Sequence, residues 1–409
     1  MNGQLLPKSD WQDAAGLQRV VLALKDGNGG PRIVGGAVRD TLLGLDVTDV
    51  DLATMLPPEI VVDRLVAAGI KAVPTGIDHG TITAIAEGRS YEITTLRSDV
   101  TTDGRRATVA FAKDWREDAA RRDFTINALY ADPVSGEIFD YVNGLDDLNS
   151  GVIKFIGDAE QRIAEDYLRI LRFFRFLARF GHGEVDPVAL RACANAAHGL
   201  TALSRERIAQ EIVKIMSLSN PVDVVAMMAE NGIFAPFLPE LSGNAANDLS
   251  RLVNREKQLG RPASLTARLL TLLPKNAVMV DKVAARLKLS NRLRENLAAR
   301  LEAPLPTPAN IRALAYHAGI DCAYDAALLY ADEEDLQECL AMLESWTVPK
   351  FPIKGGDLIK MGLPIGPRVA KTLQLLESRW VNESFPDEPR VREIADQLVI
   401  EALSASKNA

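Results

Sequence analysis

The sequence predicts an α/β head, built from a mixed sheet with helices, followed by an all-α C-terminal region. Before about residue 140, short apolar runs alternate with segments of helical period, which is typical of an α/β arrangement. After that point strand signals vanish and long segments of helical period dominate. A chain of 409 residues is too long for one compact core, so we expect roughly two to four domains.

The elements of the head follow from local patterns. Apolar residues at helical spacing predict a helix over 10–26, which a glycine-rich stretch and Pro31 end. A short strand at 33–34 then leads through Gly35 and Gly36 into a second helix, which Gly44 closes. An extended segment with Asp49 and Asp51 comes next. The pattern after it predicts a helix over 58–68, a strand over 70–73, and a hairpin of strands 81–86 and 91–96 joined by 87–90.

Composition and charge exclude several classes of protein. The hydrophobic share of 47% and the charged share of 25% are ordinary, and no apolar run reaches the ~20 residues of a membrane span. The N-terminus lacks a signal-peptide pattern, and the cysteines at 193, 322 and 339 lack metal-ligand spacing. We therefore expect a cytoplasmic protein with reduced thiols and no membrane partner. The net charge of −8 argues against nonspecific coating of nucleic acid, but the basic segment 105–122 leaves RNA binding open.

Two carboxylates form the first candidate site. In a strand, Asp49 and Asp51 would share one face while Val50 and Leu52 point into a core. Such carboxylates repel each other unless a cation lies between them, and hard oxygen ligands favour Mg²⁺. Gly35 allows close approach of a ligand to the backbone at the start of a helix, which suits a phosphate. A phosphate cradle beside a divalent-metal pair is suited to nucleotidyl transfer.

Glu92 is a further acidic candidate on the last strand of the hairpin. It shares a strand face with Thr94, opposite Tyr91 and Ile93. A glutamate there could complete the acidic cluster begun by Asp49 and Asp51. It could equally be an exposed side chain on a half-hydrated sheet, and the sequence does not decide between the two.

A stripe of arginines is the second candidate site. The segment 158–180 reads as one helix with a buried apolar stripe, and a second stripe steps by three or four residues. This second stripe carries Asp166, Arg169, Arg172, Arg175 and Arg179, and Glu165 lies four residues before Arg169. Arginines in a row repel unless they face carboxylates, phosphates or RNA, so we interpret this stripe as functional.

Four motifs in order make the chain resemble a class II tRNA nucleotidyltransferase, a family related to bacterial poly(A) polymerase. The motifs are G-G-x-V-R-D at 35–40 with D-x-D at 49–51, R-R-D-F-T-I-N-A-L at 121–129, E-D-x-L-R-x-L-R-x-x-R-F at 165–176, and a weaker S-R-E-R-I at 204–208. The resemblance covers almost the whole chain and is strongest from Arg32 to Arg179.

The resemblance implies a fold, a domain order and a reaction. The implied head is of the polymerase-β-like nucleotidyltransferase type and is catalytic. The implied domains are a head over 1–140, a helical neck for base recognition over 141–215, and a tRNA-binding body over 216–345 and tail over 346–409. The implied reaction adds C, C and A to the 3′ end of tRNA from CTP and ATP, with Mg²⁺ and without a template.

The resemblance also implies roles for individual residues. Asp49 and Asp51 would bind the metal ions. The implied nucleotide contacts are Gly35, Gly36, Arg39, Arg122, Arg172 and Arg175, and Asp166 with Arg169 would read the base. An ionised Asp only accepts hydrogen bonds and an Arg only donates them, so the pair suits the edges of cytosine and adenine. The guanine edge, with its donor and acceptor reversed, would be mismatched.

Close alternatives stay open. Poly(A) polymerase uses the same chemistry on another primer, and a CC-only enzyme would stop before the final A. Residues 97–116 resemble the full flexible loop of CCA-adding members, and 75–83 resembles their type rather than that of poly(A) polymerases. A catalytically silent RNA-binding protein and a small-molecule nucleotidyltransferase are further alternatives. In the helical region, we noted candidate phosphate contacts at Arg251, Arg255, Lys257, Arg261, Arg268, Lys350, Lys354 and Lys360.

Overall fold

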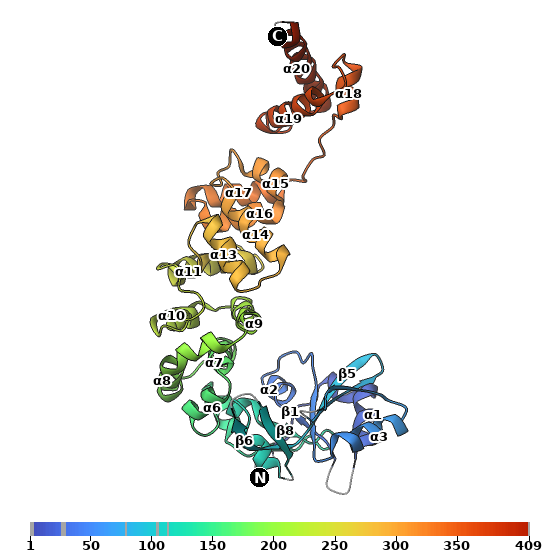
Figure 1. Ribbon diagram of the computed structural model, residues 1–409, viewed down its shortest axis with the longest axis vertical. Coiled ribbons are helices and arrows are strands. Elements are labelled where there is room, and N and C mark those ends of the chain that lie inside the picture. The colour runs from blue at the N-terminus through green and yellow to red at the C-terminus, as the bar shows by residue number, and fades with distance from the viewer. Residues whose placement is uncertain (1–3, 26–29, 78–79, 104–105, 113, 408–409) are drawn as a thin grey trace. The chain divides into compact units, whose positions relative to one another are not determined.

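The head contains a seven-stranded mixed sheet with the strand order β3-β4-β5-β2-β1-β8-β9 (Figure 1). The computed structural model describes residues 4–25, 30–77, 80–103, 106–112 and 114–407, in two units, 1–239 and 240–409. The seven strands are β1 (Arg32–Val34), β2 (Asp51–Thr54), β3 (Lys71–Gly76), β4 (Thr81–Ala86), β5 (Arg89–Thr95), β8 (Leu129–Ala131) and β9 (Ile138–Asp140). The pair β2–β5 is parallel and the other pairs are antiparallel, so the prediction of a mixed sheet is confirmed.

The helices of the head pack on this sheet. They are η1 (Asp10–Asp13), α1 (Ala15–Leu24), α2 (Gly36–Leu42), α3 (Pro58–Ala67), α4 (Trp115–Ala120), η3 (Thr125–Asn127) and α5 (Gly144–Ser150). Helices α1 and α3 pack on each other and on β4, while α2 packs on β1 and β8. The sequence predicted one helix over 10–26, but Ala14 is extended and separates η1 from α1.

The segment expected to be a flexible loop, 97–116, is an antiparallel hairpin where the structure describes it. Strand β6 (Arg97–Asp103) pairs with β7 (Arg106–Phe111), and Trp115 begins α4. Residues 104, 105 and 113 of that segment, and 78 and 79 of the stretch 75–83, lie outside the described residues. The predicted hairpin 81–96 is confirmed as β4 and β5, with a tighter turn at Glu87 and Gly88.

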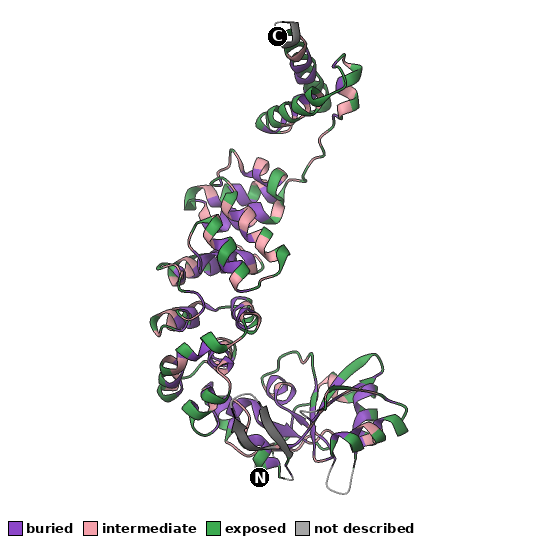
Figure 2. Ribbon diagram, in the orientation of Figure 1, coloured by how far each residue is buried: buried purple, intermediate pink, exposed green. Residues whose placement is uncertain are grey.

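The rest of the N-terminal unit is helical. Its elements are α6 (Ala159–Glu165), α7 (Leu168–Phe180), α8 (Pro187–Ala196), η4 (Ala197–Ala202), α9 (Arg205–Met216) and α10 (Val222–Glu230). Buried residues are purple in Figure 2, and those of α7 include Phe173 and Phe174, which are fully buried. The Phe173 ring lies 5.8 Å from that of Phe155 and 6.4 Å from that of Phe124, so an aromatic cluster ties α7 to the edge of the head.

The C-terminal unit is entirely helical in its described part. Its elements are α11 (Ala245–Gln258), α12 (Leu265–Thr271), α13 (Ala277–Arg286), α14 (Asn291–Glu302), α15 (Ile311–Ala318), α16 (Ile320–Tyr330), α17 (Glu333–Glu344), α18 (Gly355–Lys360), α19 (Pro367–Asn382) and α20 (Glu388–Lys407). The predicted boundary between the body and the tail, at 345–346, falls in the irregular stretch between α17 and α18. None of the helices formed by the described residues is long and apolar enough to cross a membrane.

Two of the candidate phosphate contacts are structural. Arg268 is 2% exposed and forms an ion pair with the equally buried Glu256 at 2.7 Å. Arg255 is also buried and donates to Glu333 and to the carbonyls of Leu328 and Ala331. Such arginines hold the helices together, so the sequence interpretation was wrong for these two. Lys257, Lys350, Lys354 and Lys360 are exposed.

Candidate active site

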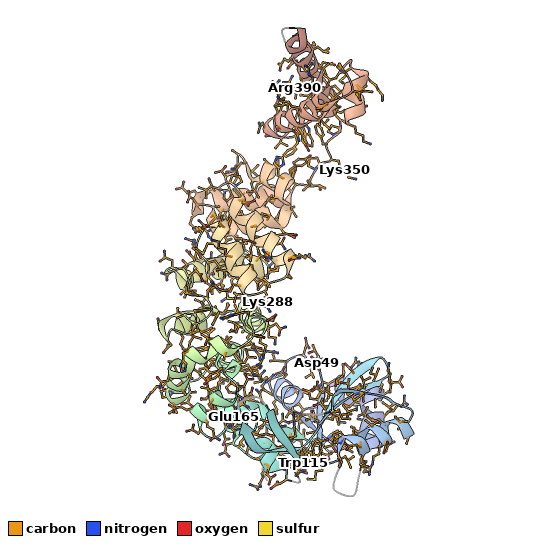
Figure 3. All side chains as sticks on the ribbon, viewed as in Figure 1. Asp49, Trp115, Glu165, Lys288, Lys350 and Arg390 are labelled. Atoms are coloured by element: carbon orange, nitrogen blue, oxygen red, sulfur yellow. The ribbon has the colours of Figure 1, made fainter. Side chains whose placement is uncertain are left out.

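One cavity of about 530 Å³ gathers most of the predicted site residues. It lies between the end of β1, the segment 121–127 and α7, all in the N-terminal unit. Its lining includes nine predicted residues: Gly35, Gly36, Arg39, Asp51, Arg122, Asp166, Arg169, Arg172 and Arg175. Asp49 and Glu92 do not line it. In Figure 3 the labels mark Asp49 in the head and Glu165 at the end of α6.

The glycine turn forms one wall of this cavity. Gly35 has φ of +70°, a conformation that L residues rarely adopt, and its N–H donates to the Leu129 carbonyl at 2.9 Å. A Cβ at Gly35 would lie 3.3 Å from the Asn127 carbonyl oxygen, so a side chain there would crowd the segment opposite. The turn therefore brings backbone rather than side chain to the cavity.

The acidic pair is arranged differently from the prediction. Asp51 begins β2, but Asp49 lies before the strand, and both are exposed while Val50 and Leu52 are buried. Both aspartates were expected to lie in the strand because the alternation of apolar and polar residues extends back to Asp49. The pairing of β1 with β2, however, ends at Asp51. The side chains still alternate as predicted.

Glu92 lies beside Asp51. The two residues are directly paired in the parallel β2–β5 ladder, so their side chains leave the same face of the sheet. The pKa of Asp51 is raised to about 6, chiefly by desolvation and also by the charges of Glu92 and Asp49, while the charge of Arg122 opposes them. Among the described residues, no group of three acidic, His or Cys side chains is placed to hold an ion. A ligand role for Glu92 therefore stays a prediction.

The predicted helix 158–180 is in fact two helices. Asp166, with φ of −154°, ends α6, and Leu168 begins α7. The Asp166 carboxylate accepts from the Leu168 N–H at 3.1 Å, which offers the backbone an alternative to the helix. Tyr167 packs closely on Gly199, where an added Cβ would lie 2.1 Å from the tyrosine ring. The break therefore carries Asp166 out of the arginine stripe.

Each arginine of α7 faces a carboxylate from another place in the chain. Arg169 pairs with Glu165 at 2.5 Å, as predicted. The other three pairs are Arg172–Asp123 at 2.5 Å, Arg175–Glu211 at 2.6 Å and Arg179–Asp40 at 3.2 Å. Burial alone would raise the pKa values of Asp123 and Glu211, but Arg172 and Arg175 outweigh it and lower them. Carboxylates therefore neutralise the stripe without displacing it from the cavity.

The expected base-reading residues are both in the cavity, each bonded to another partner. Asp166 Oδ2 accepts from Arg207 Nη2 at 2.7 Å. Arg169 Nη1 donates to Glu165 and to the Arg162 carbonyl, the latter at 2.7 Å. A base bonded to both residues would approach a carboxylate and a guanidinium that are already held in place.

Arg122 is held by a buried carboxylate. Asp118, 1% exposed, accepts from Arg122 Nη2 at 2.9 Å, from Arg121 Nε at 2.9 Å and from the Tyr130 hydroxyl at 2.7 Å. Burial alone would raise the pKa of Asp118, but these partners lower it to about 2. The Arg122 side chain that lines the cavity is therefore held in place by Asp118.

Sequence reasoning missed five polar residues of the lining. They are Arg97, Arg121, Asp123, Asn127 and Arg207. Asp123 and Asn127 belong to the R-R-D-F-T-I-N motif, where polar side chains inside an apolar run were an available signal. Arg207 belongs to the weaker S-R-E-R-I motif. Of the histidines, 182, 198 and 317 do not line the cavity and 79 lies outside the described residues, while the three cysteines are free and buried.

Comparisons with known proteins agree with this geometry. Residues 31–154 match the family described as "Poly A polymerase head domain", and residues 184–244 match "Probable RNA and SrmB-binding site of polymerase A". The chain is 36% identical over 369 residues to "CCA tRNA nucleotidyltransferase 1, mitochondrial" of Homo sapiens, covering 87% of this chain and 83% of that protein. It is 32% identical over 369 residues to the "CCA-adding enzyme" of Lacticaseibacillus paracasei, covering 87% and 89%.

A solved structure extends the similarity to the fold. The CCA-adding enzyme of Bacillus stearothermophilus in complex with CTP superposes with a TM-score of 0.74 and 29% identity, over 95% of this chain and 98% of that one. The alignment with the human relative covers 87% of this chain, so it extends beyond the head into the helical region. The chain thus belongs to the family of CCA-adding tRNA nucleotidyltransferases.

Proposed function

We propose that this protein adds C, C and A to the 3′ end of tRNA from CTP and ATP, without a template and with release of pyrophosphate. The observation that carries the proposal is a cavity lined both by Asp51, at the start of β2, and by three arginines of α7, namely Arg169, Arg172 and Arg175. Family membership and the CTP complex of the Bacillus stearothermophilus relative support it.

The acidic edge fits a divalent cation. Asp49 and Asp51 supply carboxylate oxygens, the donors that Mg²⁺ prefers, and Glu92 adds negative charge beside Asp51. We therefore propose that Asp49 and Asp51 hold Mg²⁺. When bound, such an ion neutralises phosphate charge and favours ionisation of the attacking hydroxyl.

The protein's own residues position the nucleotide. In-line attack on an α-phosphorus needs little covalent help, so orientation and charge neutralisation carry the catalysis. Gly35 and Gly36 offer backbone to the triphosphate, and Arg39, Arg122 and Arg172 offer positive charge. Asp166 presents an acceptor and Arg169 presents donors, which match the amino group and ring nitrogen of cytosine or adenine. A mismatched base would leave buried hydrogen-bonding groups of this pair without a partner, which costs about 1–3 kcal/mol for each group.

The assay for this function uses tRNA that lacks its 3′ end. The purified protein is incubated with CTP, ATP, UTP or GTP singly and with CTP and ATP together, and the 3′ ends of the products are sequenced. We expect CC from CTP alone and CCA from the mixture. Repeated A addition to any RNA would identify a poly(A) polymerase, and CC with no A from the mixture would identify a CC-only enzyme.

Replacing Asp49 by Ala tests the metal assignment and the alternative of a catalytically silent RNA-binding protein. We expect nucleotide addition to fall by about a hundredfold or more, because a charge-neutralising ion is lost. Binding of tRNA, measured by filter retention, should remain. Asp63→Ala on the exposed side of α3 is the matched control. Full activity of the Asp49 variant would contradict the assignment.

The helical region completes the proposal. We propose that the residues after the head grip tRNA, in the divisions expected from the sequence, namely neck 141–215, body 216–345 and tail 346–409. The match of residues 184–244 to a described RNA-binding segment supports part of this assignment. Because the curated relatives include mitochondrial and bacterial proteins, a cytoplasmic location stays a prediction.

A further inference from the structure

Six side chains form a closed polar circuit that joins α2, the segment 123–127 and α7. Its members are Arg39, Asp40, Asp123, Asn127, Arg172 and Arg179. On one side, Asp40 Oδ1 accepts from Arg39 Nε at 2.7 Å and Asp40 Oδ2 accepts from Arg179 Nη2 at 3.2 Å. A single buried carboxylate thus bridges α2 and α7.

The other side of the circuit runs through the R-R-D-F-T-I-N motif. Arg39 Nη1 donates to Asn127 Oδ1, and Asn127 Nδ2 donates to Asp123 Oδ1 at 3.1 Å. Asp123 Oδ2 accepts from Arg172 Nε at 2.7 Å. Arg172 and Arg179 lie about two turns apart on α7, so the helix itself closes the circuit.

Aromatic rings of α7 stabilise the arginines of the circuit. The Arg39 guanidinium lies 4.2 Å from the Phe180 ring centroid and 5.4 Å from that of Phe176. Arg179 lies 4.9 Å from the Phe180 centroid and Arg172 lies 5.3 Å from that of Phe176. Arg39 is 5% exposed, so it has little freedom to adopt other rotamers.

The circuit has an inner and an outer part. Arg39, Asp123, Asn127 and Arg172 line the cavity, whereas Asp40 and Arg179 do not. The circuit contains three arginines and two aspartates, so it carries one excess positive charge. Because Arg39 and Arg172 line the cavity, this charge favours an anion there. The outer pair contacts Arg39 through Asp40, and Arg179 lies on the same helix as Arg172.

We propose that Asp40 and Arg179 are positioning residues, whose ion pair outside the cavity holds Arg39 and Arg172 at the spacing that a nucleoside triphosphate requires. The inference rests on the nucleotide site of the proposed function and assigns two residues that touch no nucleotide. It predicts that breaking the outer pair weakens CTP and ATP alike, because the base is read elsewhere.

The test compares Arg179→Gln with wild type in the full chain. We expect the Kd for CTP and for ATP, measured by calorimetry, and the KM of both in tRNA extension to rise about three- to fivefold, the loss typical of a partly exposed ion pair. The kcat should stay unchanged, since Arg39 and Arg172 would bind the nucleotide equally strongly in the ground state and in the transition state. Arg179→Lys should recover most of the affinity.

Asp40→Asn should have the larger effect. The amide oxygen of Asn could accept from one guanidinium, but its NH2 group would face the donors of the other in a buried place, so we expect about a tenfold rise in both Kd values. Arg191→Gln, on the exposed side of α8, is the matched control and should leave both values unchanged. Thermal melts show which variants are folded. If Asp40→Asn does not fold, Arg179→Gln and Arg179→Lys decide.

The outcomes separate this inference from the proposed function. The inference is overturned if the Kd values are unchanged in folded Arg179→Gln, or if Arg191→Gln changes them equally. In either case, tRNA extension by the wild-type protein still supports the proposed function. A wild-type protein that binds CTP and ATP but does not extend tRNA overturns the function, and the Kd values of the variants still test the circuit. Failure of wild type to bind either nucleotide overturns both.

Discussion

Asp118 is a buried carboxylate on which two arginines and a tyrosine hydroxyl converge. Its position gives Arg122 a fixed direction into the cavity and gives the head a strongly pH-dependent group. The pKa of Asp118 lies at about 2, below the usual aspartate value of 3.8. Its contribution to stability is therefore present above pH 3.8 and is lost as the pH falls toward 2.

Asp118→Asn should destabilise the protein by roughly 2 kcal/mol near neutral pH, because the difference of nearly two pKa units is lost. The difference from wild type should shrink as the pH falls below about 4, where the unfolded wild-type chain takes up the proton. Urea denaturation between pH 7 and pH 3 measures it. A difference that does not change with pH would contradict the role assigned to Asp118.

At the scale of elements, the glycine turn between β1 and α2 is constrained twice, by its φ and by the nearby Asn127 carbonyl. Gly44, at the other end of α2, has φ of +65° but no heavy atom within 4 Å of an added Cβ. A substitution at Gly44 therefore tests backbone strain alone, whereas one at Gly35 tests strain together with crowding of the cavity wall.

Gly35→Ala and Gly44→Ala should each cost about 1 kcal/mol of stability, since alanine is strained at positive φ. Only Gly35→Ala should also weaken CTP binding, because its Cβ would push the segment 123–127 outward. Denaturation and calorimetry on both variants check this. Equal CTP affinity in the two variants would show that crowding at Gly35 has no consequence for the nucleotide.

At the break between α6 and α7, Tyr167 packs against Gly199 with no room for a Cβ. Gly199→Ala should displace the tyrosine and, with it, Asp166. We expect the ratio of kcat/KM for CTP over UTP to fall by about tenfold, because small misplacement of an orienting group has a large kinetic effect. Gly243→Ala, where an added Cβ meets nothing within 4 Å, is the control. An unchanged ratio in folded Gly199→Ala would dissociate base choice from this packing.

The sequence predicted most elements but not their interruptions. Periodicity located the hairpin, α3 and the buried stripe of α7, because burial on one face leaves a local pattern. The break at Asp166 leaves no such pattern: Asp166 accepts from the Leu168 N–H, and Tyr167 packs on Gly199, which is more than thirty residues away. The arginine stripe likewise predicted carboxylates, phosphates or RNA opposite it, but only the fold identifies Asp40, Asp123 and Glu211 as its partners.

At the scale of the whole molecule, the two units have separate cores. In the C-terminal unit, Trp380 is 2% exposed among the packed residues of α18, α19 and α20. Its ring lies 5.2 Å from that of Phe351 and 4.9 Å from that of Phe385, and Tyr316 of α15 packs on it at 5.5 Å. The nucleotide cavity lies wholly in the N-terminal unit.

Trp380→Ala should therefore weaken tRNA binding without changing CTP binding. The loss of a buried tryptophan costs about 3–5 kcal/mol, enough to disorder the last three helices. Calorimetry should give the wild-type Kd for CTP, while filter retention should show weaker binding of tRNA. If both ligands are weakened equally, the helical tail contributes to the nucleotide site, contrary to the proposal.

The parallel pairing of β2 with β5 has a consequence for synthesis of the protein. Asp51 and Glu92 are about forty residues apart in sequence, with α3, β3 and β4 between them, and become neighbours only through the pairing of β2 with β5. Closing so long a loop is a late event in folding. A nascent chain on the ribosome should therefore lack the acidic edge, and we expect it to be unable to extend any RNA end before its head is complete.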